Sequence, residues 1–238
     1  MCRRRAPEKS VYEDWVGRAG RGDDRTRPRI GDLGGGSDHV GFVCHLGVPG
    51  MAFSGGGSAG SAYHTAYDNL AWYRQVVGED YEPALMIARM TNGVLGRLVS
   101  EARVPVDSSA QPRFVADQLR GWRGNAFVAS AIGAEALDEI IRLADEATVA
   151  GLLADALAVT APGSHQTQPD GSMPANRFHS REGLPGRPWF QNLLVASDPD
   201  SGYGAYPLPA VRAAIAQQDA AALQRALDDI RQALASSR

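Results

Sequence analysis

The sequence predicts a glycine-rich α/β piece of about a hundred residues followed by a mostly helical piece, with the boundary near Ala102. Two observations favour this division. Glycines cluster at residues 34–36 and 55–57, on either side of the apolar stretch from Val40 to Met51, which is typical of tight loops around a buried element. Beyond residue 112, apolar residues recur instead at helical spacing.

Composition limits the classes of function. No window approaches the ~20 apolar residues of a membrane-spanning helix, and the N-terminus runs from Arg3 into further charged residues, so we expect no membrane segment and no signal peptide in this chain. The net charge of −3 and the scarcity of aromatics beside the basic N-terminal arm, where Tyr12 and Trp15 stand, argue against a nucleic-acid partner. Two cysteines, Cys2 and Cys44, cannot define a disulfide framework.

The first hundred residues contain three helical candidates and one expected strand. Residues 11–15 place two aromatics on a short helical turn, and a helix is expected from Thr65. A longer helix follows, with Pro83 tolerated in its first turn and its end before Pro105. The apolar segment from Val40 to Val48 is expected to be a strand leading into a loop.

The second part contains four helical candidates. Residues 112–131 and 134–160 are helical candidates, and the second shows apolar residues at helical spacing with acids between them. A short helix is expected at 208–217, and a final helix is expected to be capped by Asp219, with Leu223, Leu227, Ile230 and Leu234 on one face. Pro162 to Pro174 is expected to be a loop.

His64 is the most interesting histidine by position. It follows a glycine stretch and precedes a helix, so its imidazole could project from the end of an element into a cleft. Spacing alone does not distinguish a metal ligand there from an ordinary structural histidine. The other histidines, His39, His45, His165 and His179, form no recognisable metal pair.

Two further catalytic interpretations have little support. Residues 31–41 superficially suggest a phosphate-binding loop but lack the Gly-Lys-Ser/Thr that such loops need. Ser54 and Ser58 lie among glycines without forming Gly-x-Ser-x-Gly after a strand. Tyr203 lies in a glycine-containing turn, which suits either presentation at a cleft or an ordinary hydrogen-bonding role.

Six segments taken together resemble the glutamate carboxypeptidase and transferrin receptor family of zinc exopeptidases, in order and over nearly the whole chain. They are Val11-Tyr12-Glu13-Asp14-Trp15, Pro28 to Asp38, His45-Leu46-Gly47-Val48-Pro49, Tyr63-His64-Thr65-Ala66-Tyr67-Asp68, Gly183-Leu184-Pro185-Gly186-Arg187-Pro188-Trp189-Phe190, and Ser201-Gly202-Tyr203-Gly204. Six ordered matches are far more specific than any one of them.

In that family a peptidase domain with a two-zinc centre is followed by a helical domain that mediates dimerisation. The resemblance therefore implies an α/β remnant of a zinc-peptidase domain over residues 1–102. It implies an all-α (helical bundle) transferrin-receptor-like dimerisation domain over residues 103–238. A homodimer through the helical domain is the partner that this organisation implies.

The same resemblance implies roles for particular residues. By position, His64 looks like the last zinc ligand, and Tyr63 lines the cleft beside it. Tyr203 looks like the pocket residue that meets the C-terminal side of the substrate, and Ser37 and Asp38 match a loop bordering the substrate. Zinc is the cofactor that the family implies.

The departures from the family pattern bear on activity. The family's earlier zinc ligands and its catalytic Glu-Glu pair lie upstream of this chain, and the sequence contains neither His-x-Asp nor adjacent glutamates. We therefore assign no catalytic residue and expect this chain alone neither to hold zinc nor to hydrolyse peptides. Gly202 stands where glutamate-preferring members have a lysine, so selectivity for an acidic C-terminal residue is doubtful.

Three functions follow as hypotheses. The first is the C-terminal portion of a zinc-dependent exopeptidase that hydrolyses small peptides once an upstream peptidase half completes the site. The alternative is a noncatalytic dimerisation or interaction module, and an unrelated binding domain is a third. Family members are commonly exported, which suggests an exported or periplasmic location. If peptidase sheet is missing, the apolar faces around Val40 to Val48 should be exposed.

Overall fold

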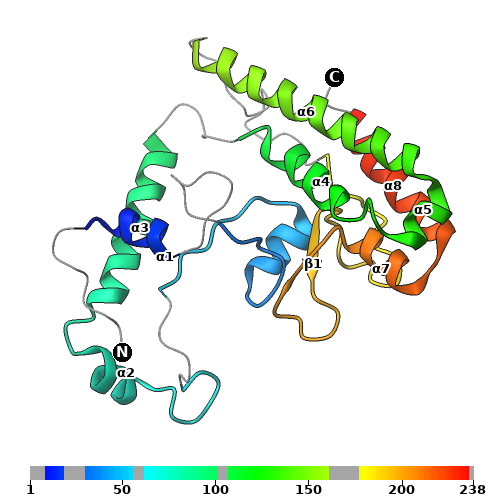
Figure 1. Ribbon diagram of the computed structural model, residues 1–238. Helices are drawn as coiled ribbons and strands as arrows, with labels where there is room; N and C mark the ends of the chain where they lie inside the picture. The colour runs from blue at the N-terminus through cyan, green and yellow to red at the C-terminus, as the bar shows by residue number, and fades with distance from the viewer. Residues whose placement is uncertain (1–8, 19–29, 56–61, 101–106, 161–176, 236–238) are drawn as a thin grey trace. The chain divides into compact units, whose positions relative to one another are not determined.

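The computed structural model describes residues 9–18, 30–55, 62–100, 107–160 and 177–235, which are mostly helical (Figure 1). The chain divides into two compact units. The first comprises Met1–Gly31 and Ala52–Ser100, and the second comprises Asp32–Met51 and Glu101–Arg238. The glycine-rich residues 32–51 therefore belong to the C-terminal unit. The predicted boundary near Ala102 lies outside the described residues.

Local signals explain where the helices of the first unit begin. Helix α1 (Val11–Arg18) starts with a capping box, in which the Ser10 N–H donates to a Glu13 carboxylate oxygen at 2.6 Å. Helix α2 (Leu70–Val77) starts later than the predicted Thr65, because the Asn69 side chain caps it by accepting the Trp72 N–H at 3.0 Å. Helix α3 (Glu82–Ser100) follows as predicted.

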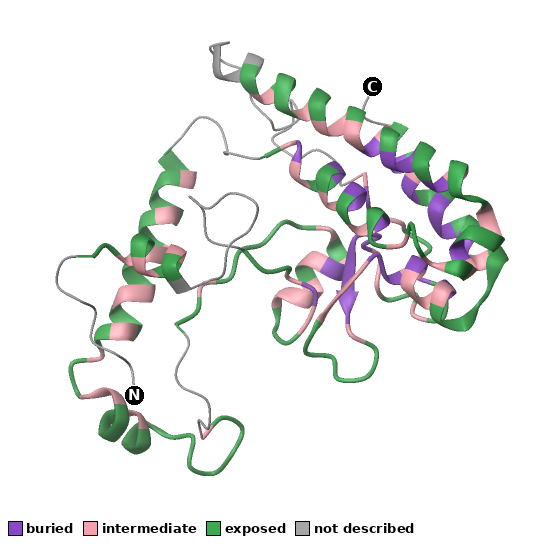
Figure 2. Cartoon of the chain, in the orientation of Figure 1, coloured by how far each residue is buried: buried purple, intermediate pink, exposed green. Residues whose placement is uncertain are grey.

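The first unit has little interior. None of its described residues is buried, and Figure 2 shows its helices without the buried class. The predicted apolar stripe of α3 remains half-exposed, with Leu85 and Leu95 at 45% and 50%. Contacts within this unit include the stacking of Tyr73 on Tyr81.

The second unit holds the hydrophobic core. It contains helices α4 (Ala110–Arg120), α5 (Ala126–Ile132), α6 (Ala134–Thr160), α7 (Pro209–Gln217) and α8 (Ala220–Ala235). Their facing sides supply most of a continuous cluster of buried residues, which includes Leu119, Ile140, Ile141, Leu223, Leu227, Ile230 and Leu234. Phe178 and Leu208, which lie outside these helices, belong to the same cluster. Burial of the predicted face of α8 is thereby confirmed, and the predicted helix 134–160 is observed with the same bounds.

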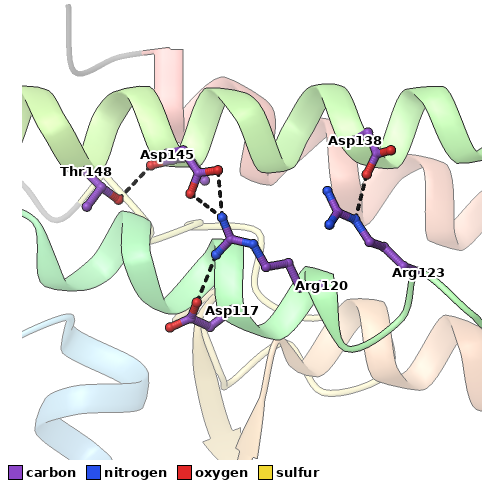
Figure 3. Close-up of polar contacts among 7 residues, drawn as sticks. Asp117, Arg120, Arg123, Asp138, Asp145 and Thr148 are labelled. Carbon is purple, nitrogen blue, oxygen red and sulfur yellow. Dashed lines mark hydrogen bonds and ion pairs between the residues drawn. The ribbon is translucent and has the colours of Figure 1, made fainter. Parts of the chain in front are cut away.

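Ion pairs reinforce the packing of α4 against α6 (Figure 3). Arg120 Nη2 lies 2.6 and 2.7 Å from the two carboxylate oxygens of Asp145, and its other terminal nitrogen lies 3.0 Å from Asp117. Arg123 Nε donates to a carboxylate oxygen of Asp138 at 2.8 Å. These groups are largely exposed, so each pair stabilises the unit by at most about 1 kcal/mol.

A two-stranded antiparallel hairpin completes the second unit. Strand β1 (Val195–Ser197) pairs with β2 (Ala205–Pro207), with Ala196 opposite Tyr206. A short π-helix, η1 (Gly41–Leu46), packs beside β1. None of the described helices combines the length and the apolarity that crossing a membrane requires.

Two expectations need correction, and a third falls on residues that the structure does not describe. The segment expected to be a strand forms η1, and the described residues up to Ser100 contain no strand, so the α/β part of the predicted fold is not confirmed whereas the helical part is. The helix predicted over 112–131 is two helices, because Asn125 caps a new start by accepting the Val128 N–H at 3.0 Å. The loop predicted between Pro162 and Pro174 lies outside the described residues.

Candidate functional site

The C-terminal end of η1 is attached to the segment before β1 through its own backbone carbonyls. The last carbonyls of a helix have no partner within the helix and need one elsewhere. Here the Cys44 oxygen accepts the N–H groups of Gln191 and Asn192, at 2.7 and 3.1 Å, and the Val43 oxygen accepts the Asn192 side-chain amide at 3.0 Å. Because these donors lie almost 150 residues further along, no local signal marks them.

Two histidines and a tryptophan extend this attachment. The His45 oxygen accepts from His179 Nε2 at 2.6 Å, and His45 Nδ1 donates to the Trp189 oxygen at 2.7 Å. The rings of His45 and Trp189 also stack, with centroids 4.8 Å apart and planes within 5°. Two segments singled out in the sequence, 45–49 and 183–190, are thus in direct contact. These contacts hold the C-terminal end of η1, and the chain enters η1 through the loop at residues 34–38.

That loop packs closely against the hairpin. A Cβ at Gly34 would lie 2.5 Å from a Val195 methyl group and 2.7 Å from the backbone of Ala205, so only glycine fits there. The Gly36 N–H donates to the Gly202 oxygen at 3.0 Å. We call residues 34–38 the glycine loop and residues 198–204 the hairpin loop. Together they form one loop pair in the second unit.

Asp198 shapes the hairpin loop from within. Its carboxylate accepts the Ser201 N–H at 2.7 Å, the Ser201 hydroxyl at 3.0 Å and the Asp200 N–H at 3.1 Å. The Ser201 N–H bond is the main reason that the pKa of Asp198 lies below its ordinary value. The loop so held presents Tyr203 with 55% of its side chain exposed.

The four predicted substrate residues and the predicted metal ligand His64 divide between the two units. Ser37 and Asp38 are exposed on the glycine loop, directly after the residue that bonds to the hairpin loop carrying Tyr203. Tyr63 and His64 belong to the first unit, where both are exposed on a turn and their rings stack at 3.8 Å. The structure therefore brings three of the five residues into one neighbourhood.

The His64 backbone has φ of 60°, a left-handed conformation that is uncommon outside glycine. In the described part of the chain, no group of three or more His, Cys, Asp or Glu side chains is arranged to hold a metal ion. A catalytic zinc takes about three protein ligands. The described residues therefore do not fit a zinc centre by themselves.

Sequence reasoning missed the residues that build the loop pair. Asn192 is 6% exposed, and its side-chain oxygen accepts the Leu194 and Val195 N–H groups at 2.9 and 3.3 Å while its amide binds η1. Arg187 donates to the Ser197 oxygen at 2.9 Å and lies over the Phe190 ring. Arg187 was visible as part of a family segment, but no pattern pointed to Asn192.

Comparison with known proteins gives a family for the C-terminal residues. Residues 173–238 match the family model of the transferrin receptor-like dimerisation domain. The chain is related to the C-terminal part of the glutamate carboxypeptidase family. The dimerisation domain thus includes the hairpin loop, α7 and α8, whereas the glycine loop that packs on it lies outside the matched residues.

Two relatives illustrate the relationship. A probable glutamate carboxypeptidase, LAMP1 of Arabidopsis thaliana, is 28% identical over 211 residues, which are 87% of this chain and 29% of that protein. The aminopeptidase NAALADL1 of Mus musculus is 31% identical over 113 residues, 42% of this chain and 15% of the relative. The chain thus spans less than a third of the length of these relatives.

Proposed function

We propose that this chain is the C-terminal portion of a zinc-dependent, glutamate carboxypeptidase-like exopeptidase that hydrolyses small peptides and dimerises through its helical domain. The main support is the Gly36–Gly202 hydrogen bond, which joins the two loops whose residues the family resemblance assigns to substrate binding. The names of the relatives, a carboxypeptidase and an aminopeptidase, agree with a peptide substrate.

Three side chains of the loop pair have chemistry suited to a polar ligand. The Tyr203 phenol can donate a hydrogen bond to a carboxylate, the Ser37 hydroxyl can donate or accept, and the Asp38 carboxylate can accept from a substrate N–H. Gly202 adds no side chain beside Tyr203. We therefore propose that the completed substrate site does not select substrates with an acidic C-terminal residue.

His64 is proposed as a zinc ligand, with Tyr63 lining the cleft beside it. Zinc in such enzymes acts as a Lewis acid and lowers the pKa of its bound water to about 7. Because the described residues do not complete a centre, we derive no catalytic step through the metal. The remaining ligands and the general base are proposed to come from a peptidase half outside this chain.

Exposed apolar side chains support the proposal that a partner covers part of this chain. Phe42, Leu46, Val48 and Met51, in and after η1, are 46–59% exposed. Exposure around Val40 to Val48 was expected from the sequence and is confirmed for Phe42, Leu46 and Val48. Apolar surface gathered in this way commonly marks an interaction site. We propose that the peptidase half covers it.

The alternative function, a noncatalytic dimerisation module, is favoured by a different observation. The second unit contains a continuous core that includes residues from α4, α5, α6, α7 and α8, so it does not depend on the first unit for its interior. Such a unit could pair with a second copy without any peptidase chemistry.

The two functions are separated by measuring mass, metal and activity. Light scattering on the purified chain should give a dimer, while metal analysis should find no stoichiometric zinc and assays no dipeptide hydrolysis. Adding a peptidase half that contains His-x-Asp and Glu-Glu should restore both zinc and hydrolysis, and His64→Ala should lower both where His165→Ala does not. Zinc-dependent hydrolysis by the chain alone would refute the partial-site proposal, and a strict monomer would refute dimerisation.

A further inference from the structure

A cavity of about 230 Å³ lies between α8 and the chain around residue 179, away from the residues of the loop pair. Asp229, Gln232 and Ala233 line one wall, because residues three and four apart share a face of a helix. Arg177 and His179 line the other, on either side of the fully buried Phe178. Phe178 belongs to the hydrophobic core, whereas its two neighbours line the cavity.

Arg177 brings a cation to this cavity without a matching anion. In the described part of the chain its guanidinium has no hydrogen bond and no carboxylate within 4.0 Å. Burial lowers its pKa, and its guanidinium carbon lies 5.2 Å from the centroid of the Phe178 ring. Half-buried charges are costly unless they are paired, so the site favours an anionic group.

Asp229 brings the opposite charge to the same cavity. Burial raises its pKa, and the nearby negative charges of Glu182 and Asp228 raise it further. Among the described residues no cation pairs with its carboxylate. A positively charged group beside Asp229 would offset this accumulation of negative charge.

We propose that this cavity binds a small zwitterion of the α-amino acid class, with its carboxylate on Arg177 and its ammonium on Asp229. The volume suits such a molecule, because drug-sized ligands occupy larger pockets of about 300–1,000 Å³. Leu193 and Ala233 provide the apolar part of the lining. The site lies in α8 and the chain leading to β1, so it requires neither zinc nor the proposed peptidase function.

Neighbouring polar groups add hydrogen-bonding capacity. His179 Nε2 carries a proton, because it donates to the His45 oxygen at 2.6 Å. In the neutral ring this leaves Nδ1 as an acceptor that an ammonium group can use. Ser180, also in the lining, offers a hydroxyl that can donate to a carboxylate.

Three related probes test the proposal on the full chain by calorimetry or by NMR titration. L-alanine carries both charges, N-acetyl-L-alanine lacks the ammonium, and L-alaninamide lacks the carboxylate. We expect L-alanine to bind with a Kd of about 1 mM or below, and each analogue at least about tenfold more weakly. No binding of L-alanine, or equal binding of either analogue, would overturn the zwitterion site.

Substitutions locate the binding. Arg177→Gln and Asp229→Asn should each weaken L-alanine binding about tenfold or more, while Arg225→Gln, an exposed arginine of α8 outside the lining, should bind like wild type. Thermal melts establish that each variant folds. Unchanged binding in the two folded cavity variants would place the ligand elsewhere and refute the assignment.

Discussion

The missing side chain at Gly34 determines how the glycine loop meets the hairpin. The neighbours that its Cβ would contact are the Val195 side chain and the backbone of Ala196 and Ala205, which belong to paired strands and have little freedom to move. Cys44, nearby in η1, is fully buried and its thiol faces the Gly34 oxygen at 3.7 Å. Single residues therefore control the geometry of the loop pair.

Gly34→Ala should destabilise the second unit by about 1–3 kcal/mol, because the added methyl group overlaps the strand backbone. Urea unfolding followed by tryptophan fluorescence measures the change. Gly31→Ala is the matched control, since nothing lies within 4 Å of its added carbon. Equal stabilities of the two variants would contradict the close packing described for Gly34.

Cys44 should be unreactive in the folded chain. Burial raises its pKa to about 11, against an ordinary thiol value of about 8.5, so at pH 8 its thiolate fraction falls by roughly 100-fold or more. In a Cys2→Ser background, thiol labelling should be slow in buffer and fast in urea. Rapid labelling of the native chain would show that Cys44 is accessible.

The raised pKa of Cys44 also makes the stability of the folded chain fall at alkaline pH. Between about pH 8.5 and the folded pKa of about 11, the unfolded thiol ionises while the folded thiol stays protonated. Its contribution to stability is therefore present below pH 8.5 and is lost as pH rises through this window. Cys44→Ala should reduce that alkaline loss in unfolding measurements.

At the scale of elements, hydrogen bonds at the ends of helices determine where each helix begins and what its end is attached to. Helix α8 begins where the Asp219 carboxylate accepts the Ala222 N–H at 2.9 Å, a cap predicted from the sequence and confirmed here. The last carbonyls of η1 instead accept hydrogen bonds from donors around Asn192. A cap whose partners lie a few residues apart can be predicted from the sequence. A helix end whose partners lie almost 150 residues away cannot.

Asp219→Ala should lower the free energy of unfolding by about 0.5–2 kcal/mol, because it removes the side-chain acceptor at the start of α8. Asp219→Asn should retain most of the stability, since an amide oxygen caps almost as well. Thermal melts by circular dichroism compare the two variants. A loss of equal size in Asp219→Asn would indicate that charge matters at this position and the cap does not.

At the scale of the whole molecule, the two units differ in how much interior they have. The second unit has a cluster of buried side chains, whereas the described residues of the first contain none that is buried. Regions with few buried apolar contacts open with smaller free energies than core elements. The first unit should therefore be the less stable part of the isolated chain.

Hydrogen exchange should show this difference directly. We expect amides in the middle of α3 to exchange at least about 100-fold faster than those in the middle of α8, because α3 has no buried face to hold it closed. Mass spectrometry of exchanged peptides gives both rates in one sample. Addition of a peptidase half should slow exchange in α3, and equal protection of the two helices in the isolated chain would refute the difference.

The sequence by itself determined the helices of the second unit, because their apolar spacing and caps are local signals. The pattern of α8, from Asp219 to Leu234, predicted both its start and its buried face. The family segments in order also indicated the relationship that the comparisons bear out. The roles predicted for His64 and Tyr203 remain predictions.

Only the tertiary structure decided what becomes of residues 32–51. Their glycines and apolar residues suited a strand in a sheet, yet they form a loop and η1 on the hairpin of the second unit. The physical reason is that the carbonyls at the end of η1 and the space beside Gly34 are matched by groups from residues 179–205. Such matching depends on contacts between segments about 150 residues apart, which no local pattern of the sequence records.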